Sequence, residues 1–314
     1  MSDPSTPEAP AAAYSWLVGF DGDWRDTWWS QDFLELVAAR LGLGERRSLV
    51  DVGCGVGHWG QRLLPLLHCD ATLVGVDREP AFVARAATAA QARGLAARAT
   101  YRQALAEALP LATASADLVT CQTVLMHVAD PAVVVAEMAR VARPGGLVLA
   151  AEPNNFGEKA SALVAAPGLS RTDRLALLEL EAVCQDGKRL AGSGDSSVGE
   201  RLPGLFAAAG LCDVRVSQNE KCAPLIPPYD TPGERAELRQ MLSWIDGGVW
   251  LGVGGTREQT QAWYLGGGGD PARFDGLWSV ARREAEAWKA AALAGTVSGA
   301  RGPTFYLVAG RRGP

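Results

Sequence analysis

The residues with the clearest chemical potential form the segment Asp51-Val52-Gly53-Cys54-Gly55-Val56-Gly57, which follows the apolar pair Leu49-Val50. A strand that runs into closely spaced glycines predicts a tight turn, and a ligand can approach its backbone N–H groups because no Cβ intervenes. The spacing alone is ambiguous, since residues 55–60 also satisfy the GxGxxG pattern of dinucleotide-binding proteins. A turn with a purely structural role is a third interpretation at this point.

Two carboxylates accompany this glycine turn. Asp51 stands two residues before the first glycine, where it would suit a ligand ammonium better than a pyrophosphate. Asp77 ends the next apolar run, residues 72–77, and at the end of a strand its carboxylate can accept both hydroxyls of a ribose. Nicotinamide enzymes share that second feature, so Asp77 by itself does not discriminate between ligands.

Short β-branched runs alternate with alanine-rich stretches of helical spacing between residues 48 and 151. The runs predict strands at 49–52, 72–77, 99–103, 117–121 and 147–151, and two more are expected at 212–218 and 304–309. The stretches between them predict helices at 57–67, 80–94 and 131–141. This alternation implies an α/β fold, a doubly wound Rossmann-like core with a mostly parallel sheet of seven strands.

Several segments in a fixed order make the interpretation more specific. VDVGCGVG, GVD, LPL, ADLV, HVADP and ARPGGLVLAAEP follow one another along residues 46–153, about a third of the chain. Together they resemble the motifs of class I S-adenosylmethionine-dependent methyltransferases, most of all the small-molecule group of the ubiquinone/menaquinone-biosynthesis type. The order of all six segments is far more specific than any single motif.

The resemblance implies a cofactor site for S-adenosylmethionine, whose product is S-adenosylhomocysteine. Gly53, Cys54 and Gly55 would hold its methionine part, with Asp51 near the ammonium, and Asp77 would take the ribose hydroxyls. Many relatives carry Asp where Leu105 stands, so the adenine is expected to rely on the backbone at Ala106. The remaining expected contacts are Arg78 beside the adenine, Cys121 and Gln122 beside the sulfonium, and Arg25 with the cofactor carboxylate.

The resemblance also suggests a division of the chain. Residues 1–13 are predicted to be a disordered tail and residues 14–45 an N-terminal helical lid, with a helix from Tyr14 to Arg40. Residues 46–314 would be the methyltransferase domain, interrupted by helical cap insertions at about 154–198 and 224–302. Within the lid, Trp24 and Trp28 are expected to contact substrate, although aromatic residues at this spacing can equally fasten a helix to a sheet.

Methyl transfer from a sulfonium mainly requires alignment of a nucleophile and exclusion of water. A general base is optional, and His127 and Glu152 are the catalytic candidates. His127 can alternatively be a packing or capping residue, whereas Glu152 directly follows the fifth strand and is expected to point toward the cleft. Asn154 and Asn155 are further candidates for substrate contact.

Composition limits the other function classes. A net charge of −5 and a pI of about 5.4 argue against a nucleic-acid partner, because proteins that bind phosphate backbones usually carry a basic stripe. No apolar run approaches the roughly 20 residues of a membrane span, and the first residues do not have the pattern of a signal peptide. Six cysteines without a CxxC pair predict neither a metal site nor disulfides, and so a cytoplasmic location.

The sequence therefore favours methyl transfer to a small-molecule acceptor such as a secondary metabolite or quinone precursor. Oxygen is favoured slightly over nitrogen or carbon as the accepting atom, and a monomer or homodimer is expected. The alternatives are a methyltransferase for RNA or protein, a nicotinamide-dependent reductase that uses residues 55–60, and a non-catalytic protein that senses the cofactor.

Overall fold

The structure is a computed structural model that describes residues 23–164, 166, 168–220, 223–250, 252 and 254–314. The predicted tail (1–13) and the first part of the predicted lid (14–22, with Tyr14) lie outside the described residues. Among the helices that are described, none combines the length and the apolar character that crossing a bilayer requires.

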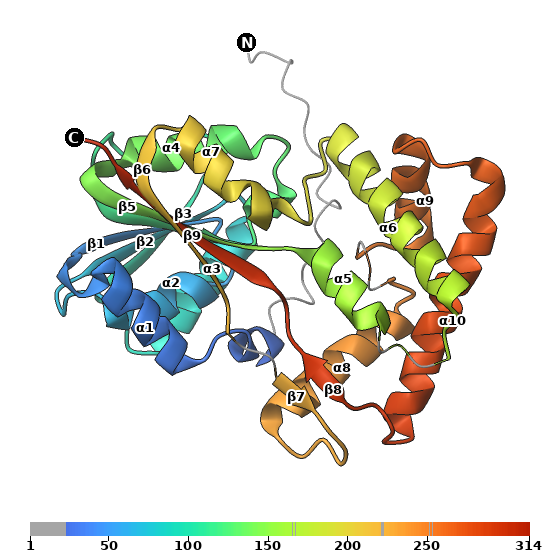
Figure 1. Ribbon diagram of the computed structural model, residues 1–314. Helices are drawn as coiled ribbons and strands as arrows, with labels where there is room; N and C mark the ends of the chain where they lie inside the picture. The colour runs from blue at the N-terminus through green and yellow to red at the C-terminus, as the bar shows by residue number, and fades with distance from the viewer. Residues whose placement is uncertain (1–22, 165, 167, 221–222, 251, 253) are drawn as a thin grey trace, which may run out of the picture.

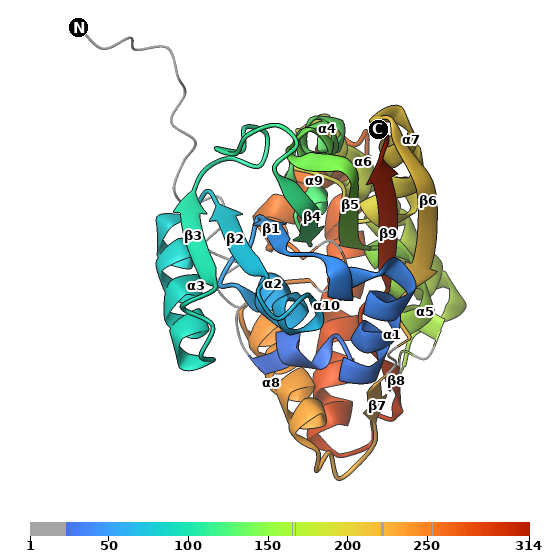
Figure 2. The same ribbon diagram turned by 90° about the vertical axis from the view of Figure 1, so that its left-hand side faces the viewer.

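A seven-stranded sheet forms the centre of the molecule, in the order β3-β2-β1-β4-β5-β9-β6. Figure 2 shows this order from β3 at one edge to β6 at the other. The first five strands are parallel, and β9 is antiparallel to both of its neighbours. The predicted fold class and its seven strands are confirmed. The strands are β1 (Ser48–Val52), β2 (Thr72–Asp77), β3 (Ala99–Gln103), β4 (Ala116–Gln122), β5 (Ala142–Pro153), β6 (Leu211–Gln218) and β9 (Phe305–Arg312).

Helices cover both faces of the sheet because the central strands are apolar on both sides. Successive side chains point to opposite faces: Leu118 of β4 packs on the side of α1 and α2, whereas Val119 packs on the side of α4 and α7. Figure 1 shows α1, α2 and α3 on one face and α4 and α7 on the other. Their bounds are α1 (Gln31–Leu41), α2 (His58–Leu63), α3 (Pro80–Ala92), α4 (Pro131–Val141) and α7 (Leu202–Ala208).

Two predicted helices differ from those observed. The helix expected over residues 57–67 ends at Leu63 and continues as a 3-10 turn, Leu64–Leu66, because Pro65 disfavours further α-helical hydrogen bonding. The helix expected from Tyr14 to Arg40 is interrupted in its described part. A 3-10 helix, η2 (Asp23–Thr27), is followed by an extended residue, Ser30, which precedes α1.

The two insertions combine into one helical cap beyond the carboxyl ends of the parallel strands (Figure 1). The cap contains α5 (Asn155–Val164), α6 (Arg171–Leu190), α8 (Pro232–Asp246), α9 (Arg257–Gly266), α10 (Pro271–Leu293) and a small sheet of β7 (Ala223–Leu225) and β8 (Gly299–Arg301). Leu177 and Leu180 of α6 share a buried cluster with Tyr264 of α9 and Phe274 of α10. Segments almost a hundred residues apart therefore form one core.

Helices α6 and α9 cross with almost no space between their backbones. A Cβ placed on Gly187 of α6 would lie 1.7 Å from the carbonyl oxygen of Trp263, and one on Gly267 would lie 2.0 Å from that of Val183. Glycine at these two positions is what allows the halves of the cap to pack together.

Replacing Gly187 with alanine should therefore lower the free energy of unfolding by about 3 kcal/mol, because the methyl group forces the two helices apart. Urea unfolding followed by circular dichroism measures this change. The matched control is Gly276→Ala on α10, where a Cβ would meet nothing within 4 Å. That substitution should instead stabilise the protein by roughly 0.5–1 kcal/mol, and equal effects of the two variants would contradict the close crossing.

Candidate active site

A cavity of about 900 Å³ lies between the carboxyl edge of the sheet and the cap. Its walls come from the ends of β1, β2 and β4, from η2, and from α5, α6, α8 and α10. This size is in the usual range for pockets that hold small molecules. The predicted site residues found in its wall are Trp24, Arg25, Trp28, Asp51, Gly53, Cys54, Gly55, Asp77, Arg78, Ala106, Gln122, His127 and Asn155.

The glycine turn presents bare backbone to this cavity. Gly53 and Gly55 have φ angles of 62° and 52°, in the left-handed region that favours glycine. A Cβ on Gly55 would meet nothing within 4 Å, whereas one on Gly53 would lie 2.4 Å from Cγ2 of Val124. The face at Gly55 is thus open to a ligand, and the face at Gly53 packs against the turn after β4.

Asp51 is 1% exposed and has one unsatisfied oxygen. Its Oδ2 accepts the backbone N–H of Gly60 at 2.9 Å, while its Oδ1 has no hydrogen-bond partner among the described residues. Burial raises the pKa of Asp51 to about 7 despite that N–H, and the Asp77 carboxylate adds to the rise. A cationic group of a ligand would complete this site and favour the ionised carboxylate.

Asp77 fixes the geometry of the same turn from the end of β2. Its Oδ2 accepts the N–H of Gly55 at 2.8 Å and its Oδ1 accepts the N–H of Glu79 at 2.9 Å. Both bonds orient the carboxylate at the cavity wall. Beyond β3, Ala106 lines the cavity, but the side chain of Leu105 is 55% exposed and lies outside its wall.

At the end of β4, Gln122 and Thr123 face the cavity and Cys121 does not. Cys121 is fully buried, and its Sγ lies 3.7 Å from Oε1 of Glu152. The alternation of side chains along a strand explains the difference: Cys121 points to the face that α4 and α7 cover, where it belongs to their hydrophobic cluster.

The prediction that Glu152 points toward the cleft is wrong. Its fully buried carboxylate accepts backbone N–H groups of Val124 (2.8 Å), Leu125 (3.0 Å) and Met126 (3.2 Å). Burial raises its pKa to about 7, and the three N–H groups oppose that rise. Glu152 therefore holds the turn after β4 in place, and this turn carries Thr123 and His127 on the cavity wall.

His127 and the two asparagines have different positions. The ring of His127 lines the cavity, and burial lowers its pKa to about 3, with Lys188, Arg25 and Arg78 contributing. The imidazole is consequently neutral at physiological pH. Asn155 also lines the cavity, but Asn154 turns away, and its Oδ1 accepts the N–H of Gly157 at 2.8 Å.

An aromatic wall closes the side of the cavity next to η2. Trp24 stands edge-on to Trp28 at 4.9 Å and to Trp244 of α8 at 5.2 Å between ring centroids. Nε1 of Trp28 is buried without a hydrogen-bond partner among the described residues. The guanidinium of Arg25 lies 4.9 Å from the centroid of Trp28 and donates to Oγ1 of Thr123 at 2.9 Å.

A comparison with known protein families matches part of the chain. Residues 50–150 match the sequence profile of a family described as a methyltransferase domain. The sequence resemblance to class I methyltransferases is thereby confirmed for the segments that carry it.

Curated relatives match over about a third of the chain. A ubiquinone biosynthesis O-methyltransferase of Methylococcus capsulatus is 37% identical over 116 residues, which cover 37% of this chain and 46% of that protein. Another, of Hahella chejuensis, is 39% identical over 113 residues, which cover 36% of this chain and 45% of that protein. The chain thus spans about half the length of the curated relatives that it matches.

Solved structures share the fold over most of the chain. The YcgJ protein of Bacillus subtilis has a TM-score of 0.50 at 16% identity, covering 91% of this chain and 100% of that one. A candidate methyltransferase of Bacillus halodurans has a TM-score of 0.51 at 17% identity, with coverages of 91% and 99%. At such low identity these likenesses establish the fold alone.

Several cavity residues outside residues 50–150 were not predicted from the sequence. They come from the cap and include Lys159, Lys188, Ser196, Glu284 and Trp288. One signal in the sequence could have indicated the two lysines. The chain has only four lysines and uses arginine for most of its cations, so each lysine is an unusual choice that could have been examined as a candidate site residue.

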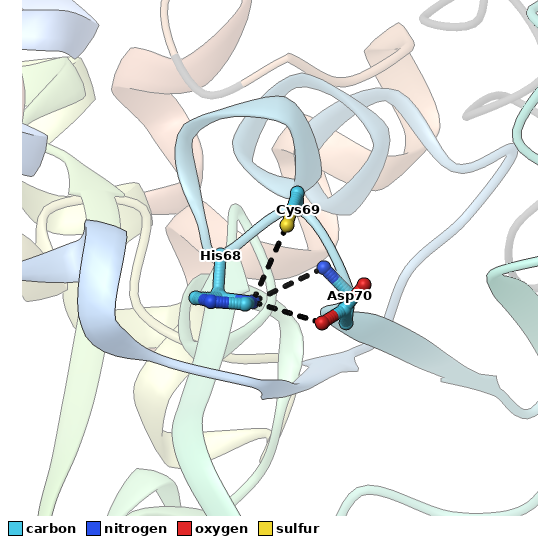
Figure 3. A group of neighbouring side chains, drawn as sticks. All are labelled: His68, Cys69 and Asp70. Atoms are coloured by element: carbon cyan, nitrogen blue, oxygen red, sulfur yellow. Dashed lines mark hydrogen bonds and ion pairs between the residues drawn. The ribbon is translucent and has the colours of Figure 1, made fainter.

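Figure 3 shows a group of three side chains with metal-ligand chemistry that are not part of the cavity wall. His68, Cys69 and Asp70 are consecutive, and their ligand atoms lie within 4.8 Å of one another. The group directly precedes the amino-terminal end of β2, whereas the cavity lies at the carboxyl ends of the parallel strands. Arg47 donates to Asp70 at 3.2 Å and approaches His68 Nε2 at 2.9 Å, so a guanidinium already serves this cluster as its cation.

The placement of Glu152 leads to a test. Glu152→Gln should lower the free energy of unfolding by about 2 kcal/mol, because the amide has one acceptor oxygen for three N–H groups and turns a donor toward them. Chemical denaturation measures the change, and exposed Glu45→Gln serves as the control. A Glu152→Gln protein as stable as the wild type would refute the structural role and return this residue to the list of catalytic candidates.

Proposed function

We propose that this protein is an enzyme that binds S-adenosylmethionine at the glycine turn and transfers its methyl group to an oxygen of a small-molecule acceptor. One observation carries the proposal. The open backbone at Gly55 lies between two carboxylates, Asp51 and Asp77, in a cavity that is lined further on by the aromatic wall and the helical cap. The domain match at residues 50–150 supports the same activity.

The residues of the first two strands fit this cofactor and suit a dinucleotide less well. The unsatisfied Oδ1 of Asp51 offers an acceptor for an ammonium, whereas a pyrophosphate at the same turn would place its negative charges beside a buried carboxylate. Asp77, held by two backbone N–H groups, presents its carboxylate to ribose hydroxyls. When bound, the cofactor supplies a methyl group activated by a positively charged sulfur.

The chain's own contribution is alignment and exclusion of water. Trp24, Trp28 and Trp244 form an apolar wall against which an acceptor can stack. His127 is kept neutral by its surroundings, so a ring nitrogen can accept a hydrogen bond from an acceptor hydroxyl and orient it. The proton that this hydroxyl releases as its oxygen bonds to the methyl carbon passes to solvent. The cap above the site favours a small acceptor over a polymer.

Oxygen is the proposed accepting atom for two reasons. The matched curated relatives are named O-methyltransferases, and they align over 36–37% of this chain. A hydroxyl also carries a proton that it can donate in a hydrogen bond, and the neutral imidazole of His127 at the cavity wall offers an acceptor that orients it.

The cofactor assignment is tested by Asp77→Ala. This variant should bind S-adenosylmethionine and S-adenosylhomocysteine about 10- to 100-fold more weakly, as expected for loss of a charged acceptor. Isothermal titration calorimetry measures both affinities, with Asp70→Ala at the far edge of the sheet as the control. Unchanged affinity in Asp77→Ala, or binding of NADPH but not S-adenosylhomocysteine by the wild type, would contradict the proposal.

The role of His127 is tested by the pH dependence of methyl transfer. With tritiated S-adenosylmethionine at saturation and a panel of small phenols, amines and acids, transfer should be found for a hydroxylated acceptor. Because the pKa of His127 is lowered to about 3, the base form is present throughout pH 5–8, and kcat should show no acidic limb there from this residue. His127→Phe should reduce kcat at least about tenfold, and an unchanged kcat would remove His127 from the mechanism.

A further inference from the structure

A polar patch lies in the wall of the same cavity. It consists of Lys188 of α6, Ser196 from the loop after α6, and His127. Lys188 is 3% exposed, and its Nζ donates to Oγ of Ser196 at 2.5 Å. The N–H of Ser196 is held in turn by Oε1 of Gln185 at 3.3 Å. The lysine is therefore fixed in position and contributes to the cavity wall.

The ammonium of Lys188 has no carboxylate partner within ion-pair distance among the described residues. Besides Ser196, it makes one contact with a charge-stabilising group, the ring of Trp263, whose centroid lies 5.1 Å away. The other buried lysine of the cap is different. Nζ of Lys159 is bonded to both oxygens of Glu284, at 2.8 and 2.9 Å, so its charge is fully neutralised inside the protein.

The acidic groups near Lys188 lie beyond ion-pair distance of its Nζ. Asp195 pairs instead with Arg201 at 2.8 Å and with Arg189 at 3.6 Å. Glu181, two turns earlier on α6, accepts from Gln185 at 2.9 Å through Oε1, while its Oε2 has no hydrogen-bond partner among the described residues, and burial raises its pKa to about 7. Both carboxylates favour the charged lysine, yet burial outweighs them and lowers the pKa of Lys188.

A buried ammonium without a counter-ion is costly, by several kcal/mol. Such a cost is tolerated where a ligand supplies the missing charge, and Lys188 reaches the cavity that would hold that ligand. Lys188 is the ammonium of this patch and has no ion pair among the described residues, so the patch can balance one negative charge of a ligand. Lys159 adds none because Glu284 already balances it.

We propose that the acceptor is a monocarboxylic acid whose carboxylate binds the ammonium of Lys188, while its apolar body stacks against the tryptophan wall. The inference rests on the proposed function for the identity of the site and specifies the acceptor class. Lys188 and the hydroxyl of Ser196 orient one end of the acceptor, so that the hydroxyl to be methylated is presented to the glycine turn. Lys188 is a specificity-determining residue in this arrangement.

Matched pairs of acids and amides test this proposal directly. Hydroxybenzoic, hydroxyphenylacetic and hydroxycinnamic acids and their neutral amides are titrated into the full-length protein, with and without S-adenosylhomocysteine, and binding is followed by calorimetry. At least one acid should bind about tenfold or more tightly than its amide. No preference for the acid in any pair would overturn the proposal.

Two lysine variants assign the preference to its residue. Lys188→Met, which keeps the length of the side chain without its charge, should bind the acid and the amide equally. Lys289→Met, which removes a lysine paired with Asp246 outside the cavity wall, should keep the wild-type preference. An acid preference that survives in Lys188→Met would refute the role of this ammonium. Binding of S-adenosylhomocysteine to Lys188→Met shows that the fold is intact.

A spectroscopic measurement covers the case in which Lys188→Met fails to fold. With four lysines in the chain, the ¹³Cε resonance of Lys188 can be assigned and titrated in the wild type. The pKa of Lys188 should rise when the preferred acid is added and stay unchanged with its amide, although Glu181, Cys184, Asp195 and His127 also face this group. An unchanged pKa with the acid contradicts the proposal. If the wild type fails to bind S-adenosylhomocysteine, the proposed function fails separately.

Discussion

Two buried carboxylates hold the glycine turn in the conformation on which the whole site depends. Asp51 bonds to Gly60 at the start of α2, and Asp77 bonds to Gly55 in the turn itself. Asp77 uses both of its oxygens for backbone N–H groups, whereas Asp51 keeps one oxygen unsatisfied. The same two side chains thus shape the turn and mark the chemistry of what binds there.

The cap adds a second set of walls to the cavity at the parallel sheet. Fold alone does not define an activity, and the sheet by itself would present the same turn to different ligands. The insertions supply Trp244 of α8 to the aromatic wall and Lys188 of α6 to the polar patch. Both helices pack against α10, so packing between the insertions shapes the cavity.

The core could be predicted from the sequence because its signals are local. Strands β2 and β3 and helix α4 begin and end where the pattern of apolar residues, Pro131 and the flanking turns indicate. Side-chain direction was harder to predict. Glu152 and Cys121 stand at strand ends that do border the cavity, yet they contact each other and the turn after β4. Their positions follow from the strand pleat and from orphan N–H groups in another segment, which motif spacing does not record.

The cap residues that line the cavity could not be predicted from the sequence for a related reason. Lys188 and Trp244 belong to segments far apart in the chain, and nothing in the spacing of either one indicates the other. They line one cavity because the helices that carry them, α6 and α8, both pack against α10. A buried lysine in a chain with few lysines indicates a candidate site residue. Burial is a tertiary property, however, and is not visible in the sequence.

The antiparallel strand β9 has a consequence for biosynthesis. It enters the sheet directly from the cap and pairs with both β5 and β6. Until residues 305–312 have left the ribosome, β5 has an unprotected apolar edge and β6 has no neighbour in the sheet. Exposed edges of this kind favour aggregation. The nascent chain must therefore keep its half-built sheet shielded while the entire second insertion is synthesised, and only the last strand closes it.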